Sequence, residues 1–203
     1  MIPNMADASL KILIILGSTR EGRFSEKPGR YMFDELSKVT GVEAELIDLR
    51  EWNLPFYDQS APPSSIKVPY THDIANTWKA KVGEADAFII IAPEYNHGYP
   101  AVLKNALDWV YKEWNNKPIG FVSYGSAMGT RSVEQLRQVA VELQMMPIRN
   151  AIHLPLDMFR GAVAVPYDAA LFKPLREPMD RVQGFFDQLL WWAQALKAAR
   201  EQK

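Results

Sequence analysis

Hydroxyl and arginine side chains follow directly after the first apolar segment of this sequence. Residues Ile12–Leu16 are all apolar, which is typical of a strand buried on both faces. A helix is predicted to begin near Ser25, because serine is a favoured N-cap residue. The polar side chains of the intervening loop are Ser18, Thr19 and Arg20, with Ser25 at its end. Free backbone N–H groups at a helix N-terminus bind anions, so this stretch predicts a site for a phosphate monoester.

Two better-known phosphate loops do not fit this stretch. Gly17 and Gly22 have the glycine spacing of a P-loop, but Arg23 and Phe24 stand where that loop requires Lys and Ser or Thr. The dinucleotide fingerprint G-x-G-x-x-G is absent, because Thr19 stands where its second glycine is required. One phosphate therefore fits the loop better than a pyrophosphate. An ordinary polar loop between a strand and a helix is the alternative that the stretch leaves open by itself.

Two further loops after apolar runs carry polar and planar groups. The first contains Pro93, Glu94, Tyr95, Asn96, His97 and Gly98, and the second contains Ser123, Tyr124, Gly125 and Ser126. No nucleophile stands beside the single carboxylate and imidazole of the first loop, so we expect no catalytic protein side chain. Its backbone N–H groups and aromatic rings, and the glycine-rich backbone of the second loop, suit a flat ring. The three loops together predict FMN, because nothing in them reads a base or holds Mg²⁺.

Length, charge and residue content exclude several classes of protein. The 203 residues are expected to form one domain, with residues 1–9 as a lead-in. The net charge of −1, without blocks of like charge, argues against binding to nucleic acid or a membrane surface. Cysteine is absent and the three histidines are scattered, so no metal site is expected. The first nine residues lack an apolar signal core, which predicts a cytoplasmic protein.

Apolar runs alternate with helical patterns along the chain, which predicts an α/β protein with a doubly wound parallel sheet and helices on both faces. The expected strands are Ile12–Leu16, Val42–Leu49, Asp86–Ala92, Pro118–Ser123 and Pro147–Leu154. We expect a last helix over Pro178–Ala199, and an irregular arm over residues 155–177 before it. Ser132 and Gln135 have the spacing of a capping box at another helix start. Ligands of such sheets bind beyond the strand C-termini, where the three polar loops lie.

Three stretches of this sequence resemble the NADPH-dependent FMN reductase family, which includes chromate, quinone and azo-dye reductases. They are Gly17-Ser18-Thr19-Arg20, Pro93-Glu94-Tyr95-Asn96 and Leu103-Lys104-Asn105-Ala106-Leu107-Asp108-Trp109. The similarity extends over roughly Lys11–Leu154. It implies a flavodoxin-like fold with five parallel strands in the order 2-1-3-4-5. It also implies tightly held FMN, and a homodimer or homotetramer with its flavins near an interface.

The resemblance also implies roles for individual residues. Ser18, Arg20 and Ser25 would hold the phosphate, with Thr19 beside them. Pro93, Glu94, Tyr95, Asn96 and Gly98 would line the isoalloxazine ring, and Ser123, Gly125 and Ser126, with Tyr124, would close its other edge. His97 lies in the same loop and is expected to govern access. Many relatives have Ser-x-Asn where this chain has Ser25-Glu26-Lys27, so the chain departs from the family pattern at the third phosphate contact.

These features predict an FMN-dependent NAD(P)H oxidoreductase. Hydride would pass from NADPH or NADH to FMN, and electrons would then reach a quinone, an azo compound, free flavin or a metal oxyanion. The alternative is a flavodoxin-type electron carrier, against which the absence of acidic clusters argues. Arg23 and Arg131 are the cations nearest the loops, so we expect them to meet the 2′-phosphate of NADPH; solvated surface arginines are the alternative.

The remaining predictions concern the surface and the core. A helix over 102–112 is expected to expose Trp109 and Tyr111 at a dimer interface. Asn105 and Asp108 are expected to be structural or interfacial, and the residues of the long connection 50–70 to wrap the surface. Trp191 and Trp192 of the last helix are expected to lie in the core.

Overall fold

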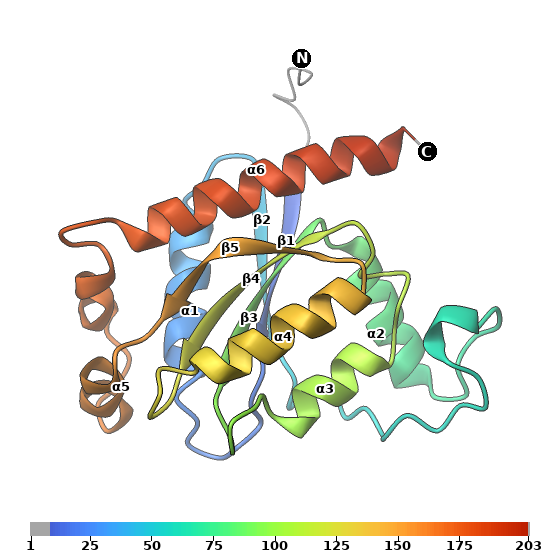
Figure 1. Cartoon of the computed structure of the whole chain (residues 1–203), viewed down its shortest axis with the longest axis horizontal. Coiled ribbons are helices and arrows are strands. Elements are labelled where there is room, and N and C mark those ends of the chain that lie inside the picture. Colours follow the sequence, from blue (N-terminus) through green and yellow to red (C-terminus); the bar gives the residue numbers. More distant parts are fainter. Residues whose placement is uncertain (1–8, 203) are drawn as a thin grey trace.

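The computed structural model describes residues 9–202 and contains one parallel five-stranded sheet (Figure 1). Its strands are β1 (Leu10–Leu16), β2 (Val42–Asp48), β3 (Ala87–Pro93), β4 (Pro118–Tyr124) and β5 (Met146–His153). They lie in the order β2-β1-β3-β4-β5, and every adjacent pair is parallel. The predicted flavodoxin-like order is therefore confirmed. Residues 1–8 of the predicted lead-in lie outside the described residues.

Helices cover both faces of this sheet. They are α1 (Glu26–Leu36), α2 (Asp73–Glu84), α3 (Ala101–Asp108), α4 (Thr130–Glu142), α5 (Leu156–Val163) and α6 (Arg181–Glu201), with the short 3₁₀ segments η1 (Pro63–Ser65) and η2 (Ala169–Leu175). The apolar residues of α2, α3 and α4 share one core cluster, and those of α1, α5, η2 and α6 share the other. The sheet is the layer between these two sets of helices.

Alternation along the central strands explains why two cores form. Successive side chains of a strand point to opposite faces, so Leu13 and Phe88 join the first cluster while Ile14 and Ile89 join the second. Every residue of β3 and β4 is buried, whereas β2 and β5 at the sheet edges are only partly buried. This is the burial expected of a parallel sheet covered by helices on both faces.

The segment 155–177 is more regular than the sequence predicts, because it contains α5 and η2. Its apolar residues pack on the sheet-covering helix α1: the ring of Phe172 stacks on Tyr31 with centroids 4.6 Å apart. The proline-interrupted pattern hid two elements that are too short to show a clear period. The prediction for α6 also needs one correction, since Trp191 is 52% exposed while Trp192 packs against the core.

Two other local predictions are wrong for identifiable reasons. Helix α4 begins after Gly129, whose φ of 73° is left-handed, so Ser132 lies inside the first turn and caps nothing.

Trp109 is fully buried, because the 50–70 connection crosses over it and the Pro55 carbonyl accepts its indole N–H at 2.7 Å. Asn105 holds the same connection through bonds to the Leu54 and Pro55 carbonyls at 3.1 and 2.9 Å. Asn105 is thus structural, as expected, whereas Trp109 is not an exposed interface residue.

Candidate functional site

The three predicted loops meet at one edge of the sheet, at the bottom of Figure 1. They follow the C-terminal ends of β1, β3 and β4, which are neighbours in the sheet. The backbone joins them: the Gly17 N–H donates to the Ile91 carbonyl at 2.9 Å, and the Glu94 N–H donates to the Tyr124 carbonyl at 3.1 Å. A Cβ at Gly17 would lie 3.0 Å from the Ile91 oxygen, so a larger residue would push the loops apart. The sequence-predicted loops therefore form one site.

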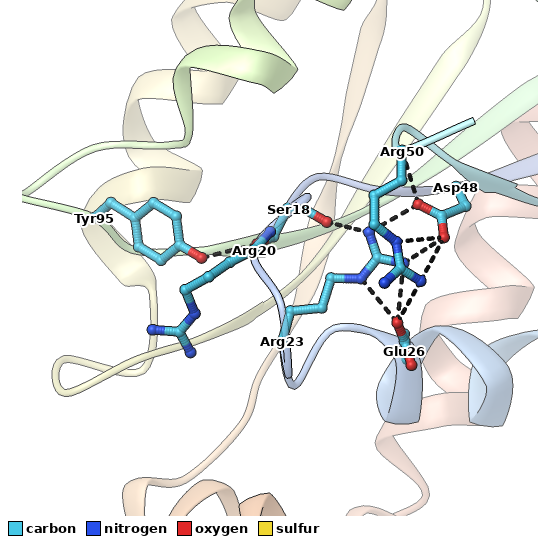
Figure 2. Close-up of polar contacts among 7 residues, drawn as sticks. All are labelled: Ser18, Arg20, Arg23, Glu26, Asp48, Arg50 and Tyr95. Carbon is cyan, nitrogen blue, oxygen red and sulfur yellow. Dashed lines mark hydrogen bonds and ion pairs between the residues drawn. The ribbon is translucent and has the colours of Figure 1, made fainter. Parts of the chain in front are cut away.

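The first loop provides donors suited to a phosphate. Ser18 and Ser25 are fully buried, and the Ser25 hydroxyl, at the N-terminus of α1, has no hydrogen-bond partner among the described residues. An unpartnered buried hydroxyl costs free energy unless a ligand satisfies it. The Arg20 side chain is exposed, and Figure 2 shows its guanidinium on the Tyr95 side of the loop. The buried hydroxyl of Ser25, the N-terminus of α1 and the exposed guanidinium of Arg20 all fit the phosphate of FMN.

Arg23 lies on the opposite side of the loop from Arg20 and points towards Asp48 (Figure 2). Its side chain is 0% exposed and forms an ion pair with Asp48, with N–O distances of 2.8 and 2.5 Å. Burial opposes ionisation of Asp48, but hydrogen bonds from Arg23 and Arg50 hold the pKa of this carboxyl well below its usual range. A guanidinium buried against its own carboxylate is not free to meet a 2′-phosphate at the surface. The predicted role of Arg23 is therefore wrong.

The side chain of Lys27 is also engaged in contacts within the protein. Its ammonium donates to the carbonyls of Ala162 and Val165 and, at 3.1 Å, to that of Val163. These carbonyls lie at the C-terminal end of α5, where a positive charge is stabilising. Lys27 thus ties the α5 segment to the start of α1.

The second loop is a tight turn with a fixed hydrogen-bond pattern. The N–H groups of Tyr95 and Gly98 donate to each other's carbonyls at 2.8 and 3.1 Å. Asn96 and His97 between them have φ angles of 50° and 72°, the left-handed pair of a type I′ turn. The N–H groups of Tyr95 and Gly98 are therefore used within the turn itself. Those of Asn96 and His97 have no acceptor in the part of the chain that the structure describes.

Helix α4 holds this turn in place. The Glu94 side chain is 4% exposed and forms an ion pair with Arg131, whose side chain is 40% exposed. Gln135 donates to the His97 carbonyl at 2.9 Å, and the Arg131 guanidinium lies 3.2 Å from the His97 ring. A Cβ at Gly98 would lie 2.8 Å from the end of the Gln135 side chain, so a larger residue there would displace that amide from the His97 carbonyl. Glu94 therefore anchors the turn through its ion pair with Arg131.

In the third loop, the side chains of Ser123 and Tyr124 are buried. The Ser123 hydroxyl lies 2.8 Å from the Met128 carbonyl and 2.7 Å from His153 Nδ1. Tyr124 packs against Phe24 with ring centroids 5.1 Å apart. Burial raises the pKa of the Tyr124 phenol well above its usual range, and the neighbouring Ser25 offsets part of this effect. Gly125, with φ of 148°, adopts a conformation that a side chain would strain.

His153 is a residue of this site that the sequence did not reveal. It lies at the end of β5 and contacts Ser123 across the adjacent strand. Burial, aided by the charge of Arg137, lowers its pKa, which favours the neutral ring. The chain order gave no signal, because 30 residues separate the two partners. Ser123 is thus a structural link within the third loop.

Metal-binding clusters and membrane-spanning helices are both absent from the described residues. In residues 9–202, no three His, Asp or Glu side chains gather closely enough to hold a metal ion. Over the same residues, no helix combines the length and the apolar character needed to cross a membrane.

Comparisons with known proteins match this arrangement. The profile of the NADPH-dependent FMN reductase family matches residues 10–157. The chain is 35% identical over 181 residues to an NAD(P)H-dependent FMN reductase of Schizosaccharomyces pombe, covering 88% of this chain and 90% of that protein. It is 31% identical over 146 residues to an NAD(P)H:quinone oxidoreductase of Solanum tuberosum, covering 69% and 72% of the two chains. The solved structure of FerB, a flavoenzyme NAD(P)H:(acceptor) oxidoreductase from Paracoccus denitrificans, has a TM-score of 0.65 at 21% identity. It covers 92% of this chain and 98% of its own, and shows the same fold.

Proposed function

Because this chain belongs to the NADPH-dependent FMN reductase family, we propose that it transfers hydride from NADPH or NADH to bound FMN and then electrons to a small acceptor. The proposed acceptors are a quinone, an azo compound, free flavin or a metal oxyanion. The similarity to a quinone oxidoreductase supports a quinone as the first to test. FMN supplies the redox chemistry when bound, and the protein supplies binding and electrostatics.

The observation that carries the proposal is the meeting of a phosphate-sized donor loop with two backbone-lined loops at one sheet edge. Ser18, Ser25 and Arg20 are proposed to hold the phosphate, with the free N–H of Thr19. Next to them, the N–H groups of Asn96 and His97 are proposed to face the ring. Donors fixed by a rigid turn stabilise developing negative charge without reorganising.

The backbone around Gly125 and Ser126 is proposed to form the other wall of the ring site. Pro93 ends β3 and is buried, so it sets the direction of the turn beside this wall. The side chains of Glu94 and Ser123 are engaged in the ion pair and hydrogen bonds described above. We propose that these two residues support the walls instead of contacting the ring directly.

Arg131 is the proposed contact for the 2′-phosphate of NADPH. Its guanidinium lies beside His97 at the open side of the turn, and Arg131 remains partly exposed despite its ion pair with Glu94. An arginine engaged by one carboxylate keeps further N–H donors for a phosphate oxygen.

The function is tested by the visible spectrum and by turnover. The purified full chain should show bound FMN, lose its flavin absorbance when NADPH is added without oxygen, and oxidise NADPH steadily when a quinone is supplied. Reduction without multiple turnover on any acceptor would identify an electron carrier. Absence of FMN binding would contradict the proposal altogether.

We also propose a homodimer or homotetramer that uses the outer face of α3. Phe56 is 82% exposed there, beside an open cavity of about 500 Å³ that Tyr57, Tyr99 and Lys104 also line. A large exposed aromatic next to an open hollow with two further aromatic rings is typical of an interface, and the second copy is the occupant we propose. Sedimentation should show a dimer or tetramer for wild type and a monomer for Phe56→Glu. A monomeric wild type at micromolar concentration contradicts it.

A further inference from the structure

The buried guanidinium of Arg23 does more than neutralise Asp48, because it also donates a hydrogen bond to the backbone of the loop after β1. Its Nη1 donates to the backbone carbonyl of Ser18 as well as to Asp48, and its Nε donates to Glu26 at 3.2 Å. One side chain therefore joins the loop after β1, the end of β2 and the start of α1. Figure 2 shows these bonds converging on the side of the loop away from Tyr95.

The hydrogen bond from Arg23 to the Ser18 carbonyl fixes the direction of the Thr19 N–H group. A trans peptide is planar, so the carbonyl of Ser18 and the N–H of Thr19 point in opposite directions. Arg23 holds the carbonyl on the inner side, which turns the Thr19 N–H towards the side where Arg20 and Tyr95 lie (Figure 2). That N–H has no acceptor among the described residues. A rotated peptide would present an oxygen to the phosphate and repel it.

We propose that Arg23 is a positioning residue that holds the Ser18–Thr19 peptide with its N–H facing the FMN phosphate, and that Asp48 holds Arg23 in turn. This inference rests on the proposed FMN-binding function. Arg23 acts through orientation and not through its own charge, because Asp48 and Glu26 neutralise it at close range. The attraction of the phosphate is left to Arg20, which is exposed on the other side of the loop.

Arg50 provides a matched control within the same cluster. It pairs with the same two carboxylates as Arg23, at 2.9 Å to Asp48 and 2.7 Å to Glu26, and its side chain is 45% exposed. It makes no bond to Ser18 among the described contacts. Removing Arg50 therefore disturbs the ion pairs and leaves the hydrogen bond from Arg23 to the Ser18 carbonyl intact.

The experiment titrates the flavin-free full chain with FMN and with riboflavin, which lacks the phosphate. Arg23→Met should weaken FMN about tenfold or more, the size expected for a lost charge-assisted hydrogen bond, and riboflavin by much less. Asp48→Asn should shift the FMN/riboflavin ratio in the same direction, and Arg23→Lys should give an intermediate ratio, because an ammonium lacks the fork that serves both acceptors. Arg50→Met should leave the ratio at the wild-type value.

Equal losses of FMN and riboflavin affinity in Arg23→Met would show a purely structural role and overturn the inference. Wild-type affinity for both flavins in Arg23→Met would overturn it as well. In either case, a wild type that prefers FMN to riboflavin would leave the proposed function standing. A wild type that binds neither flavin would instead contradict the proposed function. The two failures are therefore distinguishable.

A measurement on the wild-type protein covers the case in which Arg23→Met does not fold. The sequence contains five threonines, so ¹⁵N-threonine labelling gives a simple amide spectrum in which Thr19→Ser assigns the Thr19 signal. FMN should move this signal strongly downfield, as a phosphate acceptor does, and riboflavin should not. The same shift with both flavins, or no shift with either, contradicts the proposed direction of the Thr19 N–H.

Discussion

The hydroxyl oxygens of Ser18 and Tyr95 lie 2.8 Å apart, so a hydrogen bond joins the loop after β1 to the turn after β3 (Figure 2). The two residues are 77 positions apart in the chain. Ser18 belongs to the proposed phosphate site, and Tyr95 begins the turn proposed to face the flavin ring. The bond sets the separation of these two parts of the site before a cofactor binds.

Removal of this bond should weaken the cofactor site modestly. Tyr95→Phe keeps the ring and deletes the hydroxyl, so FMN affinity should fall by about twofold to tenfold, the effect of a neutral hydrogen bond worth roughly 0.5–1.5 kcal/mol. Tyr99→Phe is the matched control, because the described residues give the Tyr99 hydroxyl no hydrogen bond. Fluorescence titration with FMN measures both variants. Equal affinities for the two would show that the bond does not organise the site.

The exposed Arg20 should contribute through its charge. Arg20→Ala is expected to lower FMN affinity roughly tenfold or more and to leave riboflavin affinity nearly unchanged, because only FMN carries a phosphate. Arg30→Ala removes another exposed arginine, from α1, and should change neither affinity. The FMN loss should shrink at high salt, because exposed charges are screened. A similar loss of riboflavin affinity would refute the phosphate contact.

Two variants separate the possible roles of Arg131. If Arg131 binds the 2′-phosphate, Arg131→Ala should raise KM for NADPH about tenfold and leave KM for NADH almost unchanged. Glu94→Gln breaks the same ion pair but keeps the arginine, so it should not change the NADPH/NADH ratio. Steady-state kcat/KM with both nucleotides decides the matter. Equal effects on both nucleotides in Arg131→Ala would mean that the arginine serves only to hold Glu94.

Lys117 should give stability a dependence on alkaline pH. Burial lowers the pKa of its ammonium to about 8, while its Nζ donates to the Val82 and Gly83 carbonyls at 3.0 and 2.9 Å. The folded state therefore carries the full cost of the buried charge below pH 8. Between that value and the unfolded pKa of about 10.4, the unfolded chain binds more protons, so stability rises with pH.

The comparison with Lys117→Met isolates this effect from other titrating groups. Urea unfolding at several pH values between 8 and 10 should show the wild type gaining on the variant by up to about 1.4 kcal/mol per pH unit. A difference that stays constant with pH would mean that Lys117 titrates normally in the folded protein.

The sheet and its loops were predictable because they depend on local pattern. Ile12–Leu16 and the apolar run before Pro93 are long enough to identify central strands, and right-handed crossovers leave few ways to connect them. Parallel strands bring their C-terminal ends to the same edge, so the three loops had to meet there. The regular structure of segment 155–177 could not be predicted in this way, because α5 and η2 are each short and η2 contains Pro174.

Burial by distant segments was not predictable from local pattern. Trp109 resembles an exposed aromatic when only its own helix is considered, yet the connection that covers it lies about fifty residues earlier in the chain. His153 and Ser123 are likewise brought together only by the pairing of β4 and β5. In both cases the missing information was which remote segment packs on the residue.

Arg20 and Arg23 show most clearly what each level decides. The sequence by itself determined that two arginines follow the first buried strand at a predicted phosphate site, because residue type and spacing are sufficient for that. Only the tertiary structure decided that Arg20 faces solvent while Arg23 is buried and paired. The physical reason is Asp48, which the parallel pairing of β1 with β2 places beside Leu16. A buried guanidinium requires such a carboxylate to offset its desolvation, and only the folded sheet brings one within reach.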